Sequence, residues 1–159
     1  MSGRSTSGVA VACAGFLAAV LWMDLMFDVQ VLRHGSLELP EAVLASIAAY
    51  YRRVTTDASP LGYLIGVVMA VTVVSVSAQA IRAPGPPWRR LVPVVLLVGP
   101  ILLAAARVFP NAVRLGARLG SPAGQSALAR AICRDHLVCL VCVGGFLAIQ
   151  LGREAAVDR

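Results

Sequence analysis

Asp24 and Asp28 are two acids inside a hydrophobic run, residues 8–32, near the N-terminus. Because they stand four apart, a helix places both carboxylates on one face, close enough to bind the same partner. A charged carboxylate at mid-membrane costs about 2.5 to 3.5 kcal/mol on insertion scales, so neither acid should face lipid unpaired. The two acids therefore predict either that the helix leaves the hydrocarbon near Met23 or that a polar pocket receives them.

His136 is the main candidate partner for these acids. It can act as a general base oriented by Asp24 or Asp28. It can also join the two carboxylates around a transition metal, since histidine with carboxylates suits such ions. A single histidine near a helix end can equally be an interfacial hydrogen-bonding group with no chemistry. A zinc site is not expected, because the sequence has no HExxH motif and only His34 as a further histidine.

The composition identifies the elements that must position these residues. Hydrophobic residues make up 58% of the chain and charged residues 14%, with a mean hydropathy of +0.80, which indicates an integral membrane protein. Its 159 residues have room for about four spans of roughly 20 residues and no separate soluble domain. We predict one all-α domain, a four-helix transmembrane bundle with a short interfacial or lid-like helix at 40–53. The predicted spans are 8–32, 61–81, 91–109 and 126–151.

The net charge of +6 comes from arginine, because the sequence contains no lysine. The connection 82–90 holds three arginines and no acid. By the positive-inside rule, this connection and both termini are expected on the cytoplasmic side of a bacterial inner membrane. Eight arginines on the other side oppose this orientation unless nearby acids neutralise them. Membrane lipids are the expected partners, and nucleic acid is not, since the chain has no long basic run.

Most of the remaining polar residues fall at the mouth of the bundle opposite the termini, which predicts a polar cavity there. In one interpretation an amphipathic substrate enters this cavity from the lipid, and His136 moves a proton while Asp24 and Asp28 orient it or bind a metal. An arginine, Arg107, Arg114 or Arg134, would then stabilise a phenolate or enolate. In the other interpretation the charges only clamp the helices together. The residues at this mouth are Asp24, Asp28, His34, Tyr50, Tyr51, Asp57, Arg107, Asn111, Arg114, Arg134, Asp135 and His136.

Cys139 and Cys142 form a CxxC motif in the predicted last span. The segment CLVCVGGFLAI resembles the last-span element of vitamin K epoxide reductases, which are also small four-span bundles. The resemblance implies electron exchange between the two thiols and a quinone. Those enzymes also carry cysteines on the loop after span 1, and residues 33–60 contain none. The other interpretation is that both cysteines are small buried hydrophobic residues.

A second resemblance covers more of the chain. A first span rich in small residues, a helical connection, a third span running into RVFPNAVRL and a polar RDH before the last apolar stretch resemble the anthrone oxygenase-like family of small four-span membrane proteins. Its Asn-containing segment and its His or Arg at the start of span 4 correspond to Asn111, Arg114, Arg134 and His136. The tryptophan that the family often has before that histidine is absent. The resemblance implies oxygenation of a hydrophobic polycyclic phenol without an obvious cofactor.

We therefore predict a membrane-embedded enzyme, an oxidoreductase or oxygenase, that acts on a hydrophobic small molecule. The alternatives are a non-catalytic membrane subunit or lipid-binding bundle, and a thiol redox protein. The cofactor stays open between none, a transition metal and a quinone. The chain is also compatible with a homo-oligomer.

Overall fold

The computed structural model describes residues 2–57 and 59–157, and the regular structure of these residues is entirely helical. Two π-helical segments, Arg53–Asp57 and Ala104–Val108, extend α2 and join α4 to α5. The prediction of an all-α fold is confirmed. The α-helices are α1 (Ser2–Asp28), α2 (Glu41–Arg52), α3 (Ser59–Arg82), α4 (Pro87–Leu103), α5 (Phe109–Gly116) and α6 (Pro122–Val157).

Four helical stretches are long and apolar enough to cross a membrane. The chain is thus an integral membrane four-helix bundle with a short helix, α2, between the first two spans. The third stretch extends past residue 109, because the π-helical segment continues α4 into α5 without a break. Pro110 falls in the first turn of α5, where a proline does not interrupt the helix. The stretches are Gly8–Arg33, Pro60–Arg82, Pro87–Gly116 and Pro122–Arg153.

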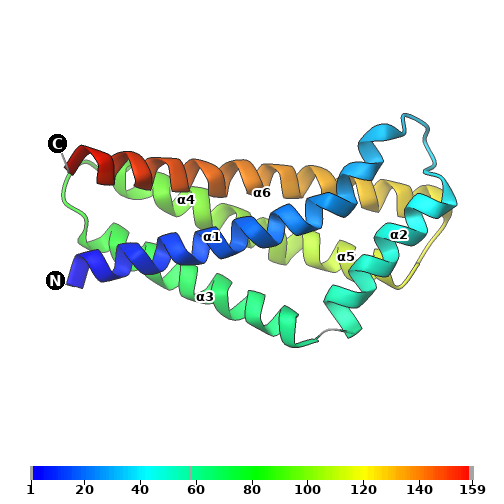
Figure 1. The fold of residues 1–159 in the computed structure, drawn as a ribbon, viewed down its shortest axis with the longest axis horizontal. Helices are drawn as coiled ribbons and strands as arrows, with labels where there is room; N and C mark the ends of the chain where they lie inside the picture. Colours follow the sequence, from blue (N-terminus) through cyan, green and yellow to red (C-terminus); the bar gives the residue numbers. More distant parts are fainter. Residues whose placement is uncertain (1, 58, 158–159) are drawn as a thin grey trace.

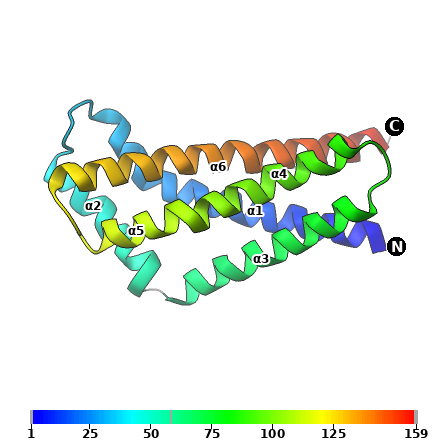
Figure 2. The ribbon, with the colours of Figure 1, turned by 180° about the vertical axis from the view of Figure 1, so that it is seen from behind.

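The four spans form a ring in which α1 packs against α3 and α6, and α4 packs against the same two helices. Both termini lie at one end of the bundle, together with the connection between α3 and α4 (Figure 1). The view from behind shows α2 and α5 side by side at the opposite end (Figure 2). We refer to this end as the mouth of the bundle.

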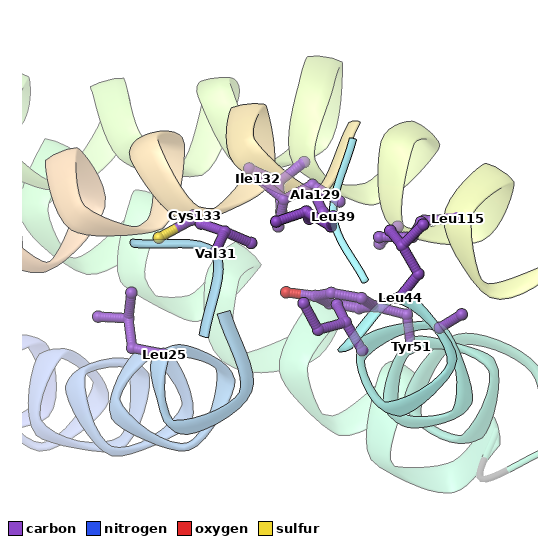
Figure 3. Close-up of a cluster of buried hydrophobic side chains, with 13 residues drawn as sticks. Leu25, Val31, Leu39, Leu44, Tyr51, Leu115, Ala129, Ile132 and Cys133 are labelled. Carbon is purple, nitrogen blue, oxygen red and sulfur yellow. The ribbon is translucent and has the colours of Figure 1, made fainter. Parts of the chain in front are cut away.

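Two hydrophobic clusters fill the interior, one in each half. In the half near the termini, small residues of α1 allow the helices to approach closely. At the mouth, the second cluster joins α1, α2, α5 and α6, and it includes the ring of Tyr51 (Figure 3). The first cluster consists of Ala10, Ala14, Val76, Leu97, Val143 and Phe146.

Helix α2 covers the mouth as a packed lid. Gly116, at the end of α5, touches the backbone of α2: a Cβ atom on this glycine would lie 2.7 Å from the amide nitrogen of Arg52. Glycine is needed here because no side chain fits between the two helices. An ion pair between Arg118 and Glu41 joins the first turn of α2 to the residues after α5. These contacts fix the position of the α2 side chains that face the bundle.

The loop before α2 is attached to α6. The hydroxyl of Ser126 accepts a hydrogen bond of 3.0 Å from the amide of Leu39. Arg130 donates to the carbonyl oxygens of His34, at 3.0 Å, and of Ser36. Arg130, one of the eight arginines at the mouth, therefore holds a loop instead of lying free at the membrane surface.

Candidate functional site

Asp28 and His136 form a buried pair between the end of α1 and the middle of α6. Nδ1 of His136 lies 2.7 Å from Oδ2 of Asp28, and the two side chains are 5% and 0% exposed. Since a carboxylate can only accept, this hydrogen bond assigns a proton to Nδ1 of the imidazole. When the imidazole is neutral, Nε2 is then left as a free base. The pair thus has the acid-oriented histidine arrangement of many general bases.

Asp24 lies at the other edge of the same imidazole. Its Oδ2 is 3.7 Å from Nε2 of His136, and the Asp24 side chain is 14% exposed. Its Oδ1 accepts a hydrogen bond of 2.6 Å from the hydroxyl of Tyr50. The spacing of four between Asp24 and Asp28 therefore does bring both carboxylates to one partner, and that partner is His136.

Tyr51 completes the arrangement from the lid. Its ring extends from α2 into the space between α1 and α6 (Figure 3), and its hydroxyl donates a hydrogen bond of 2.6 Å to Oδ1 of Asp28. Burial raises the pKa of both Tyr50 and Tyr51 above the usual value, and the neighbouring aspartates raise it further. Both hydroxyls therefore stay protonated and act as hydrogen-bond donors.

These five side chains form one connected group, which we call the acid–imidazole cluster. It runs from one tyrosine through three ionisable groups to the other tyrosine. With both carboxylates ionised and the imidazole neutral, the cluster carries a charge of −2, so two added protons make it neutral. The cluster therefore holds three groups that can each bind or release a proton, and general acid–base chemistry is what such an arrangement can offer. Its order is Tyr50, Asp24, His136, Asp28, Tyr51.

A groove of about 560 Å³ lies beside α2 and reaches this cluster. Phe27 and Tyr50 stack in its wall, with ring centroids 4.1 Å apart. Tyr50 thus faces the groove and also binds Asp24. The lining residues are Phe27, Ser46, Ala49, Tyr50, Arg52, Arg53 and Asp57.

A second polar group, the arginine–aspartate cluster, lies where the π-helical segment after α4 meets α6. Arg134 donates to Oδ1 of Asp135 at 3.2 Å, and Nε of Arg107 lies 3.3 Å from Oδ2 of the same buried carboxylate. The Arg107 contact is an ion pair without hydrogen-bond alignment. The side chain of Arg107 is 50% exposed and that of Arg134 is 65% exposed. Two charged clusters therefore exist in place of one converging cavity.

The predicted site residues are divided between these two clusters and helix α5. Within the described part of the chain, Arg107 and Arg134 contact Asp135 and make no contact with His136. Asn111 and Arg114 lie on α5, half-buried and exposed respectively, and among the described residues neither forms a hydrogen bond or ion pair with the acid–imidazole cluster. The structure thus unites Asp24, Asp28 and His136 but not the arginines and asparagine that were expected beside them. The physical reason is that adjacent residues on α6 point about 100° apart, so Asp135 and its neighbour face different helices.

The side chains of the acid–imidazole cluster are bonded to one another and not arranged around an ion. Among residues 2–57 and 59–157, no group of three His, Cys, Asp or Glu side chains has the arrangement of a metal site. A metal lies about 2.0 to 2.2 Å from each nitrogen or oxygen ligand, so the 2.7 Å between Nδ1 of His136 and Asp28 leaves no space for an ion between them. The donor set fits proton transfer better than metal binding.

The CxxC motif lies on α6, away from the mouth. Cys139 is buried and Cys142 half-buried, and both are free thiols. The thiol of Cys139 lies 3.7 Å from the carbonyl oxygen of Pro100, to which it donates. Cys139 thus packs against α4 at Pro100, one of the two prolines inside that helix.

Tyr50 and Tyr51 are the site residues that sequence reasoning missed. The sequence places both among the polar residues of the mouth, but it does not single them out as candidates for a role in the site. The available signal was their hydroxyl groups: two buried acids need donors, and tyrosine is an apolar side chain with one donor at its tip. Their pairing with individual aspartates depends on how α2 folds back over the bundle.

Comparisons with protein-family models, with curated proteins and with solved structures find no match to this chain. The geometry described above therefore supplies the argument for function.

Proposed function

We propose that the protein is a membrane-embedded enzyme that removes a proton from a hydrophobic small molecule bound in the groove. The observation that carries the proposal is the position of Tyr50. Its ring lines the groove, and its hydroxyl is hydrogen-bonded at 2.6 Å to Asp24, next to the Asp28–His136 pair. A substrate hydroxyl bound in the groove would therefore be connected to the buried carboxylate of Asp24 through one side chain, that of Tyr50.

The proton moves in two linked steps. The substrate hydroxyl gives its proton to the oxygen of Tyr50, and Tyr50 gives its own proton to Asp24. Because burial and Asp24 hold the pKa of Tyr50 high, Tyr50 conducts the proton and does not remain a phenolate. His136, oriented by Asp28, then stabilises the acceptor through Nε2, which lies on the side of Asp24. The product of the step is the substrate oxyanion.

Such an oxyanion connects the site to the predicted oxidoreductase activity. A deprotonated phenol is richer in electrons than the phenol and is oxidised more readily. In the oxygenation that the family resemblance implies, dioxygen would be the oxidant and the phenolate the electron donor. A bacterial inner membrane with cytoplasmic termini remains part of the proposal, and it rests on the arginines of the connection between α3 and α4.

The direct test is identification of what the protein binds. The protein is purified in detergent, its ultraviolet-visible spectrum is recorded, and co-purified compounds are extracted for mass spectrometry. We expect a stoichiometric aromatic compound in wild-type protein, and turnover of that compound that is lost in His136→Ala while folding is retained. An active His136→Ala protein would contradict the proposal. Elemental analysis of the same sample measures any bound metal.

A structural clamp is the second candidate function, because Asp28 is fully buried and joins three helices through His136 and Tyr51. The variant Asp24→Asn separates the two candidates. Asparagine can still accept from Tyr50, but one of two neighbouring negative charges is removed. A catalytic site predicts lost turnover with an equal or higher melting temperature, because strained charges at active sites reduce stability. A clamp predicts a lower melting temperature.

A further inference from the structure

One face of α2 and of the π-helical segment after it lines the groove. Ser46, Tyr50, Arg53 and Asp57 follow one another at spacings of three or four, so they lie on the same side of the helix and of the π-helical segment after it. The aromatic ring of Tyr50 and the guanidinium of Arg53 are therefore neighbours along the groove. The groove thus has an apolar ring, that of Tyr50, and a cation, that of Arg53, about one helical turn apart.

The charges in the groove are unbalanced. Arg52 forms a loose ion pair of 3.8 Å with Asp57, and both side chains are largely exposed. Arg53 has no ion-pair partner within residues 2–57 and 59–157. The groove thus holds one uncompensated positive charge, and it lies beside the stacked rings of Phe27 and Tyr50. Arginine binds carboxylates with two parallel hydrogen bonds, which favours it at sites for organic acids.

We propose that the occupant of the groove is an aromatic amphiphile with a single carboxylate. Its ring system packs along Phe27 and Tyr50, and its carboxylate binds Arg53. A hydroxyl on the ring then points towards the oxygen of Tyr50, which is where the proposed function removes a proton. The inference rests on that function for the reaction only, because binding of the amphiphile is measured without turnover.

The test is equilibrium dialysis of 2-naphthoate against the full-length protein in phosphatidylcholine nanodiscs. Empty nanodiscs correct for partition into lipid, and methyl 2-naphthoate serves as the neutral analogue. We expect Arg53→Gln to weaken binding of 2-naphthoate by about tenfold or more, as loss of a charged hydrogen bond does. Asp57→Asn should strengthen it several-fold, because it removes the negative charge of the groove. Arg89→Gln is the matched control, since Arg89 is in the first turn of α4, which follows the connection at the end of the bundle opposite the mouth, and it should leave the affinity unchanged.

Three results would overturn the inference: no binding above empty nanodiscs, equal affinity for the neutral ester, or an unchanged affinity in Arg53→Gln. A further arm uses nanodiscs with phosphatidylglycerol. If this anionic lipid abolishes binding of 2-naphthoate, the arginine holds a lipid headgroup and the proposal fails. His136→Ala distinguishes failure of this inference from failure of the proposed function. The variant should abolish turnover of the co-purified compound, while its affinity for 2-naphthoate stays within about twofold of wild type.

Discussion

Asp135 and His136 are adjacent on α6, yet they belong to two different kinds of charged cluster. Asp135 faces two arginines, which stay positively charged at any ordinary pH and remain half exposed. His136 faces two aspartates and is buried with them, and every charge in its cluster can be removed by moving a proton. The arginine–aspartate cluster joins α6 to the π-helical segment after α4, whereas the proposed function assigns proton transfer to the acid–imidazole cluster.

The position of each cluster agrees with this difference. The side chains of Arg107 and Arg134 are 50% and 65% exposed, so pairing with Asp135 costs the arginines little desolvation. The acids and imidazole lie under the lid formed by α2, where two tyrosines supply the donors that water would otherwise supply. The second cluster also lies next to the groove lined by Phe27 and Tyr50.

The largest difference between the clusters is expected on loss of their central acids. Asp28→Ala leaves the hydroxyl of Tyr51 and Nδ1 of His136 without their partner in a buried space. Each unpaired buried group costs about 1 to 3 kcal/mol, so we expect the two together to lower the free energy of unfolding by about 2 to 6 kcal/mol. Unfolding by sodium dodecyl sulfate in mixed micelles measures it, and a variant within 0.5 kcal/mol (an ordinary surface effect) of wild type would show that Asp28 is solvated.

The next largest effect on stability is expected at the contact between Gly116 and α2, the helix that covers the acid–imidazole cluster. Gly116→Ala forces a methyl group to within 2.7 Å of the backbone of Arg52, so α2 must shift and move Tyr51. Overpacking of this kind costs about 1 to 3 kcal/mol. Gly144→Ala is the control, because a Cβ atom there has open space around it. Equal melting temperatures for the two variants would disprove the close contact between α5 and α2.

The arginine–aspartate cluster should respond more weakly. Asp135→Asn removes the charge that two half-exposed arginines share, and water can replace much of the lost interaction. We expect a loss of about 1 kcal/mol, reduced further in 0.5 M salt, as for partly exposed ion pairs. Denaturation at low and high salt measures it. A loss as large as that of Asp28→Ala would remove the distinction between the clusters.

The smallest expected effect is a dependence of stability on alkaline pH. Burial and the aspartates raise the pKa of Tyr51 in the folded state, while in the unfolded state the pKa stays near its ordinary value of 10.0. Above that pH the unfolded chain releases the proton and the folded chain keeps it, so the free energy of unfolding decreases as pH rises. The melting temperature between pH 9 and 11 should fall less steeply in Tyr51→Phe than in wild type. Parallel slopes would indicate an exposed hydroxyl.

Hydrophobicity and length were sufficient to predict the four spans, since a helix in lipid must satisfy its own backbone. The meeting of Asp24, Asp28 and His136 was also predictable, because two acids four residues apart on a membrane helix need a common partner. The extension of the third span beyond 109 was not, since the π-helical segment Ala104–Val108 carries the helix past the arginine there.

The partners of the arginines could not be predicted for a different reason. Arg107 meets Asp135 because of how its π-helical segment is rotated against α6, and hydrophobic content alone leaves that rotation undetermined. The same holds for Tyr50 and Tyr51, whose hydroxyls reach the aspartates only because Gly116 lets α2 lie close to α5. Sequence spacing fixes contacts within a helix, and contacts between helices follow from packing.

Nitrogen-15 NMR of protein labelled at histidine is the most direct measurement of the acid–imidazole cluster, because the chain has only His34 and His136. In nanodiscs, Nδ1 of His136 should carry a strongly hydrogen-bonded proton that is lost in Asp28→Asn. Its Nε2 signal should shift in Tyr50→Phe, which disconnects the groove, while both signals of His34 stay in place. If the His136 signals are the same in wild type and both variants, the side chains are not connected, and the proposed path of the proton is wrong.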